Sequence, residues 1–237
     1  MKFDVIKKDV VTSTNTLLKE MAHSGAKSGT VIIANKQTAG KGRMGRSFYS
    51  PEDTGIYLSV LLREPSLSEP TLLTTAAAVA VMKAISRTTK KEPKVKWVND
   101  ILLDNKKVCG ILTEGEFCES RLMFAIVGIG INVSTQNFPD DIKSRAGSIT
   151  ADTSLKDELT QNLLFYLSQE FENADNREFL DYYRKRCVTV GKNIKIISPG
   201  KEPKEAFAEG IDDCAALIVR YADGTTENIS SGEASIR

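Results

Sequence analysis

The sequence of 237 residues predicts an α+β fold, in which a mixed, mostly antiparallel sheet is flanked by helices and followed by a small β-barrel. Three observations support this fold class. Short β-rich runs separated by turn residues fill residues 94–133, which is typical of an antiparallel meander. Apolar residues recur at helical spacing in residues 70–85 and 154–172. After residue 190, the pattern changes to short strands separated by turns rich in Gly, Pro and Asp.

The N-terminal quarter predicts a short strand, a helix and two further strands. Helical spacing of apolar residues predicts the helix at residues 14–22. A β-branched run at residues 31–33 predicts a strand, and a glycine-rich, basic loop follows at residues 37–50. Residues 55–62, GIYLSVLL, predict a buried strand because the run is almost entirely apolar.

The middle of the chain predicts a buried helix, the meander and two closing helices. Residues 70–85 are rich in Ala and Leu and have no helix breaker after the first position. Within the meander, strands at residues 100–103 and 107–112 are joined by a turn, so they predict a hairpin. Helices at residues 154–172 and 177–186 complete the α+β domain.

The tail predicts a separate small unit with strands at residues 193–197, 206–211 and 217–221. A unit of this size buries too little apolar surface to be stable alone, so we expect it to dock on the larger domain. We therefore divide the chain into a domain at residues 1–188 and a β-barrel domain at residues 189–237.

Composition excludes several classes of protein. Lys plus Arg number 32 and Asp plus Glu number 31, so the net charge of +1 provides no global field for nucleic acid or an anionic membrane. No signal peptide and no run of about 18 apolar residues is present, and we expect a soluble cytoplasmic protein. The four cysteines have no Cys-x-x-Cys spacing, so we expect reduced, mostly buried thiols and no metal ligands.

The basic loop contains Gly40, Gly42 and Gly45, which match the G-x-G-x-x-G pattern of dinucleotide-binding turns. Such a turn opens directly into a helix, whereas Pro51 and Gly55 obstruct a helix here. The spacing of a P-loop is also absent. The remaining interpretations are a phosphate-binding loop, whose glycines let the backbone approach a ligand, and an ordinary solvated basic loop.

A second group of residues comprises Lys96-Trp97-Val98-Asn99-Asp100 and, after the hairpin turn, Lys107. The hairpin would bring Lys107 back towards Asn99 and Asp100, so that an amide, a carboxylate and an ammonium group meet. The alternative for Trp97 is a core position, and the alternative for Lys107 is a surface charge.

Taken together, these stretches resemble the biotin protein ligase family over essentially the whole chain. The matching blocks, in order, are Ser13-Thr14-Asn15, Gln37 with GKGRMGR at residues 40–46, KWVND at residues 96–100, Lys107 in KVCGIL, and GIGIN at residues 128–132. The resemblance implies a catalytic domain like those of class II aminoacyl-tRNA synthetases and biotin ligases, with an SH3-like C-terminal barrel.

The resemblance also implies the roles of individual residues. It implies catalytic roles for Lys107, Arg43 and Asp100. For biotin it implies contacts from Ser13, Thr14, Asn15, Gln37, Lys41, Gly42, Arg43, Lys107 and Gly110. For ATP or the adenylate it implies contacts from Gly40, Lys41, Arg43, Gly45, Arg46, Phe48, Lys96, Trp97, Asn99, Lys107 and Asn132. The C-terminal residues Glu233 and Arg237 resemble a family segment that approaches the nucleotide.

The implied reaction is the activation of biotin by ATP to biotinyl-5'-adenylate, followed by transfer of biotin to a lysine of the biotin carboxyl carrier domain of a carboxylase. Mg²⁺ is expected with the phosphates of ATP, without a dedicated set of protein ligands. A homodimer formed through the sheet is a further possibility within the family.

Three positions depart from the family pattern. Lys41 replaces the usual Arg and keeps the charge without the planar fork, Phe48 replaces the usual Trp with a smaller aromatic face, and Val98 replaces Pro. The matching blocks begin within the first 15 residues, which leaves no room for the DNA-binding domain of the repressor members. We therefore expect no binding to operator DNA.

Two other functions remain open on the sequence. A lipoate protein ligase shares the fold and the adenylation chemistry, but it needs a longer apolar slot for its acid. A non-catalytic module that senses a ligand or binds nucleic acid is the alternative of a different class, although the near-neutral charge counts against it.

Overall fold

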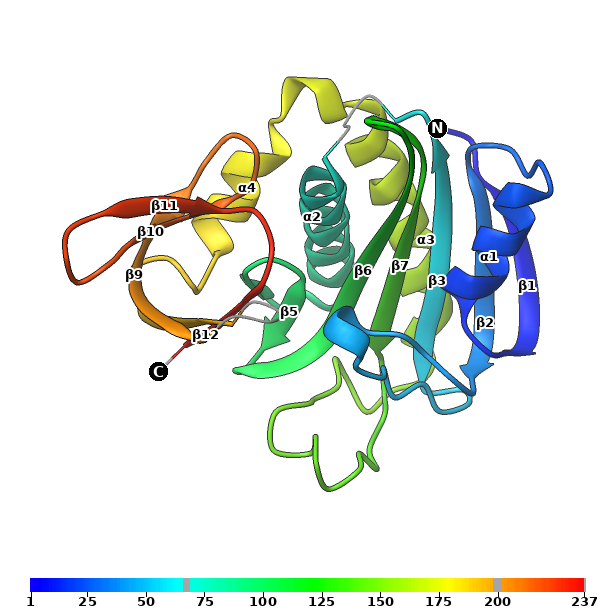
Figure 1. Ribbon diagram of the computed structural model, residues 1–237. Coiled ribbons are helices and arrows are strands. Elements are labelled where there is room, and N and C mark those ends of the chain that lie inside the picture. The colour runs from blue at the N-terminus through cyan, green and yellow to red at the C-terminus, as the bar shows by residue number, and fades with distance from the viewer. Residues whose placement is uncertain (66–68, 198–201, 237) are drawn as a thin grey trace.

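The computed structural model describes residues 1–65, 69–197 and 202–236, and it has two sheets (Figure 1). The large sheet has the strand order β1-β2-β3-β7-β6-β5-β4, and only β1 and β2 pair in parallel. This mostly antiparallel sheet with flanking helices confirms the predicted α+β class. Its strands are β1 (Asp4–Val11), β2 (Thr30–Gln37), β3 (Gly55–Arg63), β4 (Lys94–Lys96), β5 (Asp100–Leu103), β6 (Lys106–Cys118) and β7 (Arg121–Asn132).

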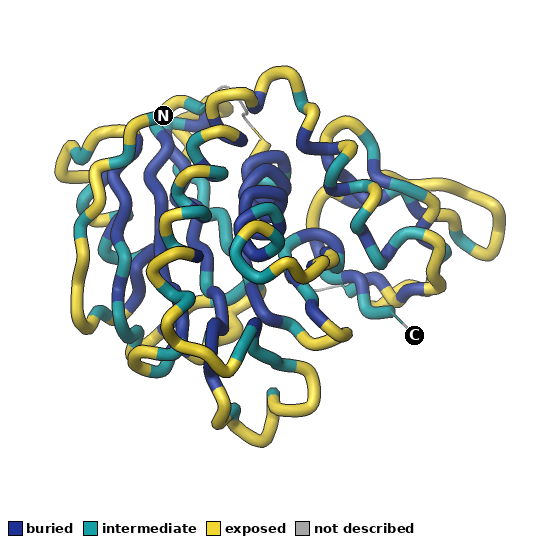
Figure 2. The backbone as a smooth tube through the Cα atoms, turned by 180° about the vertical axis from the view of Figure 1, so that it is seen from behind, coloured by how far each residue is buried: buried dark blue, intermediate teal, exposed yellow. Residues whose placement is uncertain are grey.

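Helices cover both faces of the large sheet. The helices are α1 (Thr14–His23), α2 (Pro70–Thr89), α3 (Leu155–Glu172) and α4 (Phe179–Arg186). Because side chains alternate along a strand, Val60 and Leu62 join the core with α2, whereas Leu61 joins a smaller cluster with Leu18 of α1. Helix α2 is buried along most of its length (Figure 2), which explains why its sequence is apolar on all sides.

The predicted hairpin between β5 and β6 is present and has a two-residue turn. Asp104 and Asn105 both have positive φ, 49° and 60°, as a type I′ turn requires. This turn places Leu102 opposite Lys107, and a shift of register between Ile101 and Leu102 then places Asp100 opposite Gly110. Asp100, Leu102 and Lys107 therefore share one face of the hairpin, so the expectation that Lys107 returns towards Asp100 is confirmed.

The second sheet, called here the C-terminal sheet, has the order β11-β10-β9-β8-β12 and is antiparallel throughout. Its strands are β8 (Asn193–Ile197), β9 (Lys204–Ile211), β10 (Leu217–Arg220), β11 (Thr226–Ile229) and β12 (Glu233–Ile236). The first three were predicted. The last two were not, because β11 is exposed at three of its four residues and lacks an apolar pattern.

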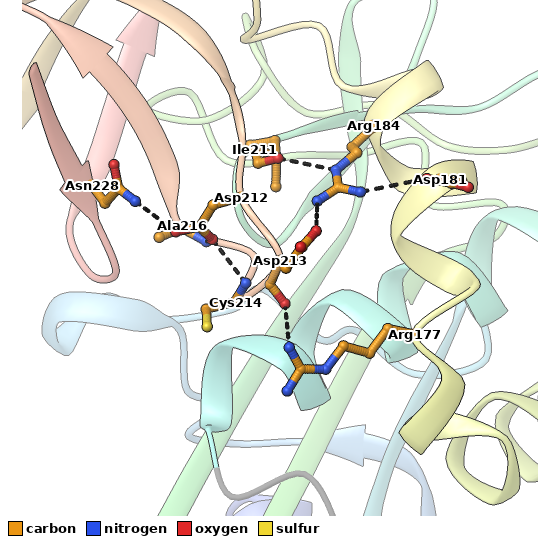
Figure 3. A network of polar contacts seen from close by, with 9 residues as sticks. All are labelled: Arg177, Asp181, Arg184, Ile211, Asp212, Asp213, Cys214, Ala216 and Asn228. Atoms are coloured by element: carbon orange, nitrogen blue, oxygen red, sulfur yellow. Dashed lines mark hydrogen bonds and ion pairs between the residues drawn. The ribbon is translucent and has the colours of Figure 1, made fainter.

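The C-terminal sheet docks on α4, as expected. Arg184 of α4 donates to the backbone oxygen of Ile211 at 3.0 Å and pairs with Asp213 at 2.6 Å (Figure 3). Arg177 donates to the backbone oxygen of Asp213 at 2.9 Å. On the other side of the same turn, the indole N–H of Trp97 donates to the backbone oxygen of Ala215 at 3.0 Å. The turn between β9 and β10 is thus held both by α4 and by Trp97, which lies between β4 and β5 of the large sheet.

The cysteines differ partly from expectation. All four are free thiols, but only Cys109 and Cys187 are buried, whereas Cys118 and Cys214 are exposed because they lie at hairpin turns. Burial raises the pKa of the Cys109 thiol far above its ordinary value, so this thiol stays protonated.

Among the helices that the structure describes, none is both long enough and apolar enough to cross a membrane.

Candidate active site

Two adjoining pockets bring most of the predicted site residues together. The first, called the α1 pocket, is lined by Ser13, Thr14, Asn15, Gln37, Lys41, Gly42, Arg43, Phe48, Asn99, Lys107, Gly110, Ile111, Leu112, Gly128, Ile129 and Gly130. The second, called the cationic pocket, has a cavity volume of about 330 Å³, and five cationic side chains line it: Arg43, Arg46, Lys96, Lys107 and Arg145. Gly42, Arg43, Phe48, Asn99 and Lys107 line both pockets.

The polar end of the α1 pocket is built by the N-terminus of α1. The backbone N–H of Thr14 donates to Oε1 of Gln37 at 2.9 Å, and the Thr14 hydroxyl donates to the same atom at 3.2 Å. Nε2 of Gln37 donates to the hydroxyl of Ser50 at 2.9 Å. Ser13 is the N-cap by backbone position but makes no capping hydrogen bond through its side chain. Its hydroxyl is therefore available to bind a ligand in the α1 pocket.

Asn15 lies behind this polar end, and the sequence did not predict its hydrogen-bond partners. Its Nδ2 donates to Oε2 of Glu114 at 2.6 Å, and the hydroxyl of Ser59 donates to its Oδ1 at 2.6 Å. A Cβ at Gly128 would stand 2.1 Å from Oδ1, so only glycine leaves room for the amide. Ser59 had one available signal, since it is a small polar residue inside the apolar run of β3. The carboxylate of Glu114 had none.

The floor of the α1 pocket is a pair of glycines on neighbouring strands, Gly110 and Gly130. The ring of Phe48 lies against both. A Cβ at Gly130 would stand 2.4 Å from Cε1 of Phe48, and a Cβ at Gly110 would stand 3.3 Å from Cε2. The α1 pocket accordingly has a cavity volume of only about 40 Å³, room for a few water molecules. A larger ligand requires the ring of Phe48 to move.

The glycine-rich loop closes on itself as a narrow hairpin and does not open into an α-helix. The N–H of Gly42 donates to the oxygen of Arg46 at 2.7 Å, and the N–H of Phe48 donates to the oxygen of Gly40 at 2.8 Å. Gly45 has a φ of 73° in the short 3₁₀ turn (Arg43–Gly45), and a Cβ on Gly40 would stand 2.5 Å from the oxygen of Phe48. Gly40 and Gly45 line neither pocket, so they shape the loop.

The loop arginines reach the meander and the C-terminal sheet. Arg43 donates from Nη1 to Oδ1 of Asn99 at 3.2 Å and from Nη2 to the oxygen of Gly232 at 2.9 Å. Burial lowers the pKa of Arg43 from its ordinary value, although Asp100 and Glu233 oppose this change, and a guanidinium stays charged in proteins. Arg46 pairs with Glu233 at 2.6 Å. Glu233 therefore lies at the site, while Arg237 is outside the described residues.

Lys107 stands at the junction of the two pockets. Its Nζ lies 2.5 Å from Oδ1 of Asp100, and both side chains remain partly accessible. The backbone of Lys107 is fixed by the loop after β7, because its N–H donates to the oxygen of Arg145 and its oxygen accepts from Gly147. Nδ2 of Asn132 donates to the same Gly147 at 3.2 Å. A positive charge with a carboxylate beside it is thus held where two ligands would meet.

Trp97 combines the two interpretations given above. It lines the cationic pocket, but it is 3% exposed and its indole N–H is used by Ala215. Its main observed role is therefore in the core that joins the two sheets. Lys96 is half-buried and lines the same pocket.

The donor set suits phosphates better than a metal bound by protein alone. Within residues 1–65, 69–197 and 202–236, no three His, Cys, Asp or Glu side chains lie together as a metal site would need. The acidic side chains of the cationic pocket are Asp100 and Glu233, each paired with a cation. This arrangement fits an ion that arrives on phosphate oxygens and takes one carboxylate from the protein.

Two family models match the chain. The model described as Biotin/lipoate A/B protein ligase family matches residues 8–132, and the model described as Biotin protein ligase C terminal domain matches residues 189–237. The first description includes both biotin and lipoate ligases. The second names biotin protein ligases alone, which separates the two possibilities left open by the sequence.

Individual relatives agree with the family models. The bifunctional ligase/repressor BirA of Bacillus subtilis (strain 168) is 43% identical over 228 residues, which cover 91% of this chain and 69% of that protein. The biotin--[acetyl-CoA-carboxylase] ligase of Mycobacterium tuberculosis is 31% identical over 234 residues, covering 93% and 84%. The structure of biotin protein ligase from Aquifex aeolicus in complex with biotin and ATP has a TM-score of 0.82 at 28% identity, covering 99% and 98%.

The similarity thus extends over the two pockets and over the C-terminal sheet that contacts them. On this evidence the chain belongs to the biotin protein ligase family.

Proposed function

We propose that this enzyme activates biotin with ATP and transfers it to a lysine of a carboxylase's biotin carboxyl carrier domain. The observation that carries the proposal is the position of Lys107 and Arg43, which line both pockets. An acid in the α1 pocket and a nucleotide in the cationic pocket would meet at these two cations. The named relatives and the Aquifex aeolicus complex with biotin and ATP support this assignment.

In the first half-reaction, the carboxylate of biotin attacks the α-phosphate of ATP, and diphosphate leaves. Two anions must approach each other, so the positive charges of Lys107, Arg43 and Arg46 lower the repulsion and stabilise the phosphoryl oxygens. Mg²⁺ bound to the phosphates would add charge neutralisation, with Asp100 as the carboxylate best placed to contact it. The ureido ring would bind at the polar end of the α1 pocket, through Ser13, Thr14 and Gln37.

In the second half-reaction, the neutral amine of the acceptor lysine attacks the carbonyl carbon of the adenylate, and AMP leaves. Lys107 is placed to stabilise the oxygen on which negative charge develops. Asp100, 2.5 Å from Lys107, is the side chain we assign to accept the proton of the attacking amine. Phe48 and the loop hairpin would cover the adenylate and exclude water.

Isotope exchange between diphosphate and ATP tests the proposal directly. We expect exchange that depends on biotin and Mg²⁺ and that lipoate does not support. Mass spectrometry of a purified carrier domain should then show one added biotinyl group at one lysine. Exchange driven by lipoate, or by neither acid, would overturn the assignment.

The oligomeric state is a separate proposal. β1 is an edge strand of the large sheet, and we propose that a homodimer would form by pairing at a sheet edge. Light scattering at several protein concentrations, with and without biotin and ATP, measures it.

A further inference from the structure

Arg145 is a cation of the cationic pocket that the proposed chemistry does not use. It lies in the loop between β7 and α3, and its backbone oxygen accepts the N–H of Lys107 at 2.7 Å. Arg145 is thus attached to the residue that stands at the junction of the two pockets. In the part of the chain that the structure describes, its side chain makes no hydrogen bond and no ion pair. The pocket therefore has an uncompensated guanidinium on this loop.

Its accessibility separates Arg145 from the two arginines of the glycine-rich loop. Arg43 is half-buried and is held by the backbone oxygen of Gly232 at 2.9 Å. Arg46 pairs with Glu233 at 2.6 Å. Arg145 is exposed and still lines the cationic pocket, so it lies at the rim. A group that is too large to enter the pocket can reach a cation in this position.

The charge balance of the cationic pocket changes between the two half-reactions. Its five cationic side chains outnumber its two carboxylates, Asp100 and Glu233, by three charges. In the first half-reaction, the phosphates of ATP and the carboxylate of biotin offset this positive surplus. After diphosphate leaves, the adenylate keeps a single negatively charged phosphate, so the positive surplus grows just before the acceptor binds. This stage favours an acceptor that has acidic side chains.

We propose that Arg145 binds an acidic side chain of the carrier domain, close to the lysine that becomes biotinylated. The partner that fits is a folded domain that presents a carboxylate near its acceptor lysine. A guanidinium suits this contact, because it stays charged and can hold both oxygens of a carboxylate. The contact would direct the acceptor amine towards Lys107, whose backbone is bonded to Arg145. The inference rests on the proposed function, since the carrier domain is its second substrate.

The test isolates the second half-reaction by supplying synthetic biotinyl-5'-adenylate without ATP. Two acceptors are compared, a purified carrier domain and hydroxylamine, which is a small uncharged nucleophile without a carboxylate. Single-turnover rates, with the enzyme in excess over the adenylate, give the maximal rate and half-saturating concentration for the carrier and a second-order rate constant for hydroxylamine.

Three variants of the enzyme are compared with the parent. Arg145→Ala removes the guanidinium, and Arg145→Lys keeps the charge without the planar fork. Lys143→Ala makes the same charge change in the same loop. It is the matched control, because Lys143 is exposed and lines neither pocket.

We expect Arg145→Ala to raise the half-saturating concentration of the carrier about three- to fivefold at low ionic strength. The maximal rate with the carrier and the rate constant for hydroxylamine should stay within about twofold of the parent. Arg145→Lys should recover part of the loss, and Lys143→Ala should resemble the parent. Added salt should reduce the difference between the parent and Arg145→Ala, because it screens the interaction between the two charges.

Variants of the carrier identify the carboxylate. Each Asp or Glu around the acceptor lysine is replaced in turn by Asn or Gln. One of these replacements should raise the half-saturating concentration with the parent enzyme but not with Arg145→Ala, because the two groups form a single contact. If every replacement acts equally on both enzymes, no carboxylate binds Arg145 and the inference is overturned.

The remaining results separate the two possible failures. If the parent transfers biotin to no lysine of the carrier, the proposed function is wrong and this inference falls with it. If Arg145→Ala slows the reactions with the carrier and with hydroxylamine equally, Arg145 acts on the adenylate. In that case, or if Arg145→Ala changes neither reaction or Lys143→Ala has the same effect, the inference is overturned while the proposed function stands.

Discussion

The position of Lys107 depends on the conformation of two turn residues, Asp104 and Asn105. The turn at Asp104 and Asn105 has two positive φ angles, and its type I′ conformation matches the twist of the strands β5 and β6 that it joins. A one-residue change of register would move Lys107 to the other face of the hairpin, away from Asp100. The chemistry proposed for this residue thus depends on the conformation of its turn.

Lys107→Ala and Arg43→Ala should each lower the rate of biotin-dependent diphosphate release about 100-fold or more, because each removes a positive charge placed where charge develops. Single-turnover formation of the adenylate measures this effect, and circular dichroism checks the fold. Lys106→Ala is the matched control, since Lys106 is exposed, on the same strand, and lines neither pocket. Near-normal rates in both site variants would contradict the roles assigned here.

Single residues of the site were predictable to different degrees. The hydroxyls, amides and cations near the ligand belong to compact blocks such as Ser13-Thr14-Asn15 and residues 40–46, so the sequence predicts them. Glu233 was indicated by the resemblance of the C-terminal segment, whereas Glu114 is an ordinary acidic residue in a strand, and only the tertiary structure places it beside Asn15. Asn15 lines the α1 pocket, where it was predicted to contact biotin, and its amide also bonds to Ser59 and Glu114.

At the scale of elements, strands β6 and β7 provide a surface that side chains would block. Gly110 and Gly130 lie opposite each other, and the ring of Phe48 lies over the pair. Two adjacent strands without side chains on one face leave a flat backbone floor, on which a ring can lie.

Gly130→Ala should weaken biotin binding by at least about tenfold, because its methyl group would occupy the position of the Phe48 ring and narrow the pocket floor. Calorimetric titration with biotin measures the change. Gly210→Ala provides the comparison, since a Cβ there meets its nearest atom, Cδ1 of Ile218, at an ordinary 3.8 Å. Equal biotin affinities of the two variants would show that biotin binding does not require a pocket floor without side chains.

Elements of the fold were predicted where the pattern of the sequence is strong. The buried helix, the meander and the β5–β6 hairpin follow from apolar periodicity and turn residues. β11 and β12 escaped prediction because they are short and largely polar, and pairing with neighbouring strands defines them more than their own composition does.

At the scale of the whole molecule, the C-terminal sheet connects a structural anchor to the active site. One turn of this sheet is held by Arg184 and Trp97, and another provides Gly232 and Glu233 to the loop arginines. The sheet therefore contributes to the site without forming the pocket floor. Its docking was predictable from its small size, but its contact with the loop was not, because no local pattern links residues so far apart in sequence.

Arg184→Met should raise the KM for ATP several-fold and leave biotin affinity within about twofold, because a loosened C-terminal sheet holds Arg43 and Arg46 less firmly. The thermal midpoint should fall by only a few degrees, since the ion pair with Asp213 is largely exposed. Arg220→Met, which removes an ion pair between β10 and β9 of the same sheet, should leave both constants unchanged. An unaltered KM for ATP in Arg184→Met would mean that docking does not influence the loop.

The hydrogen bond from Arg43 to Gly232 joins residues separated by 189 positions. Contacts of such long range form late, because the loop between them must first be closed. During synthesis on the ribosome, the walls of the α1 pocket, whose lining residues all lie between Ser13 and Gly130, can be in place before this contact exists. In a nascent chain, the basic loop would then lack its contacts with Gly232 and Glu233. Activity would begin only when the C-terminal sheet has emerged and docked.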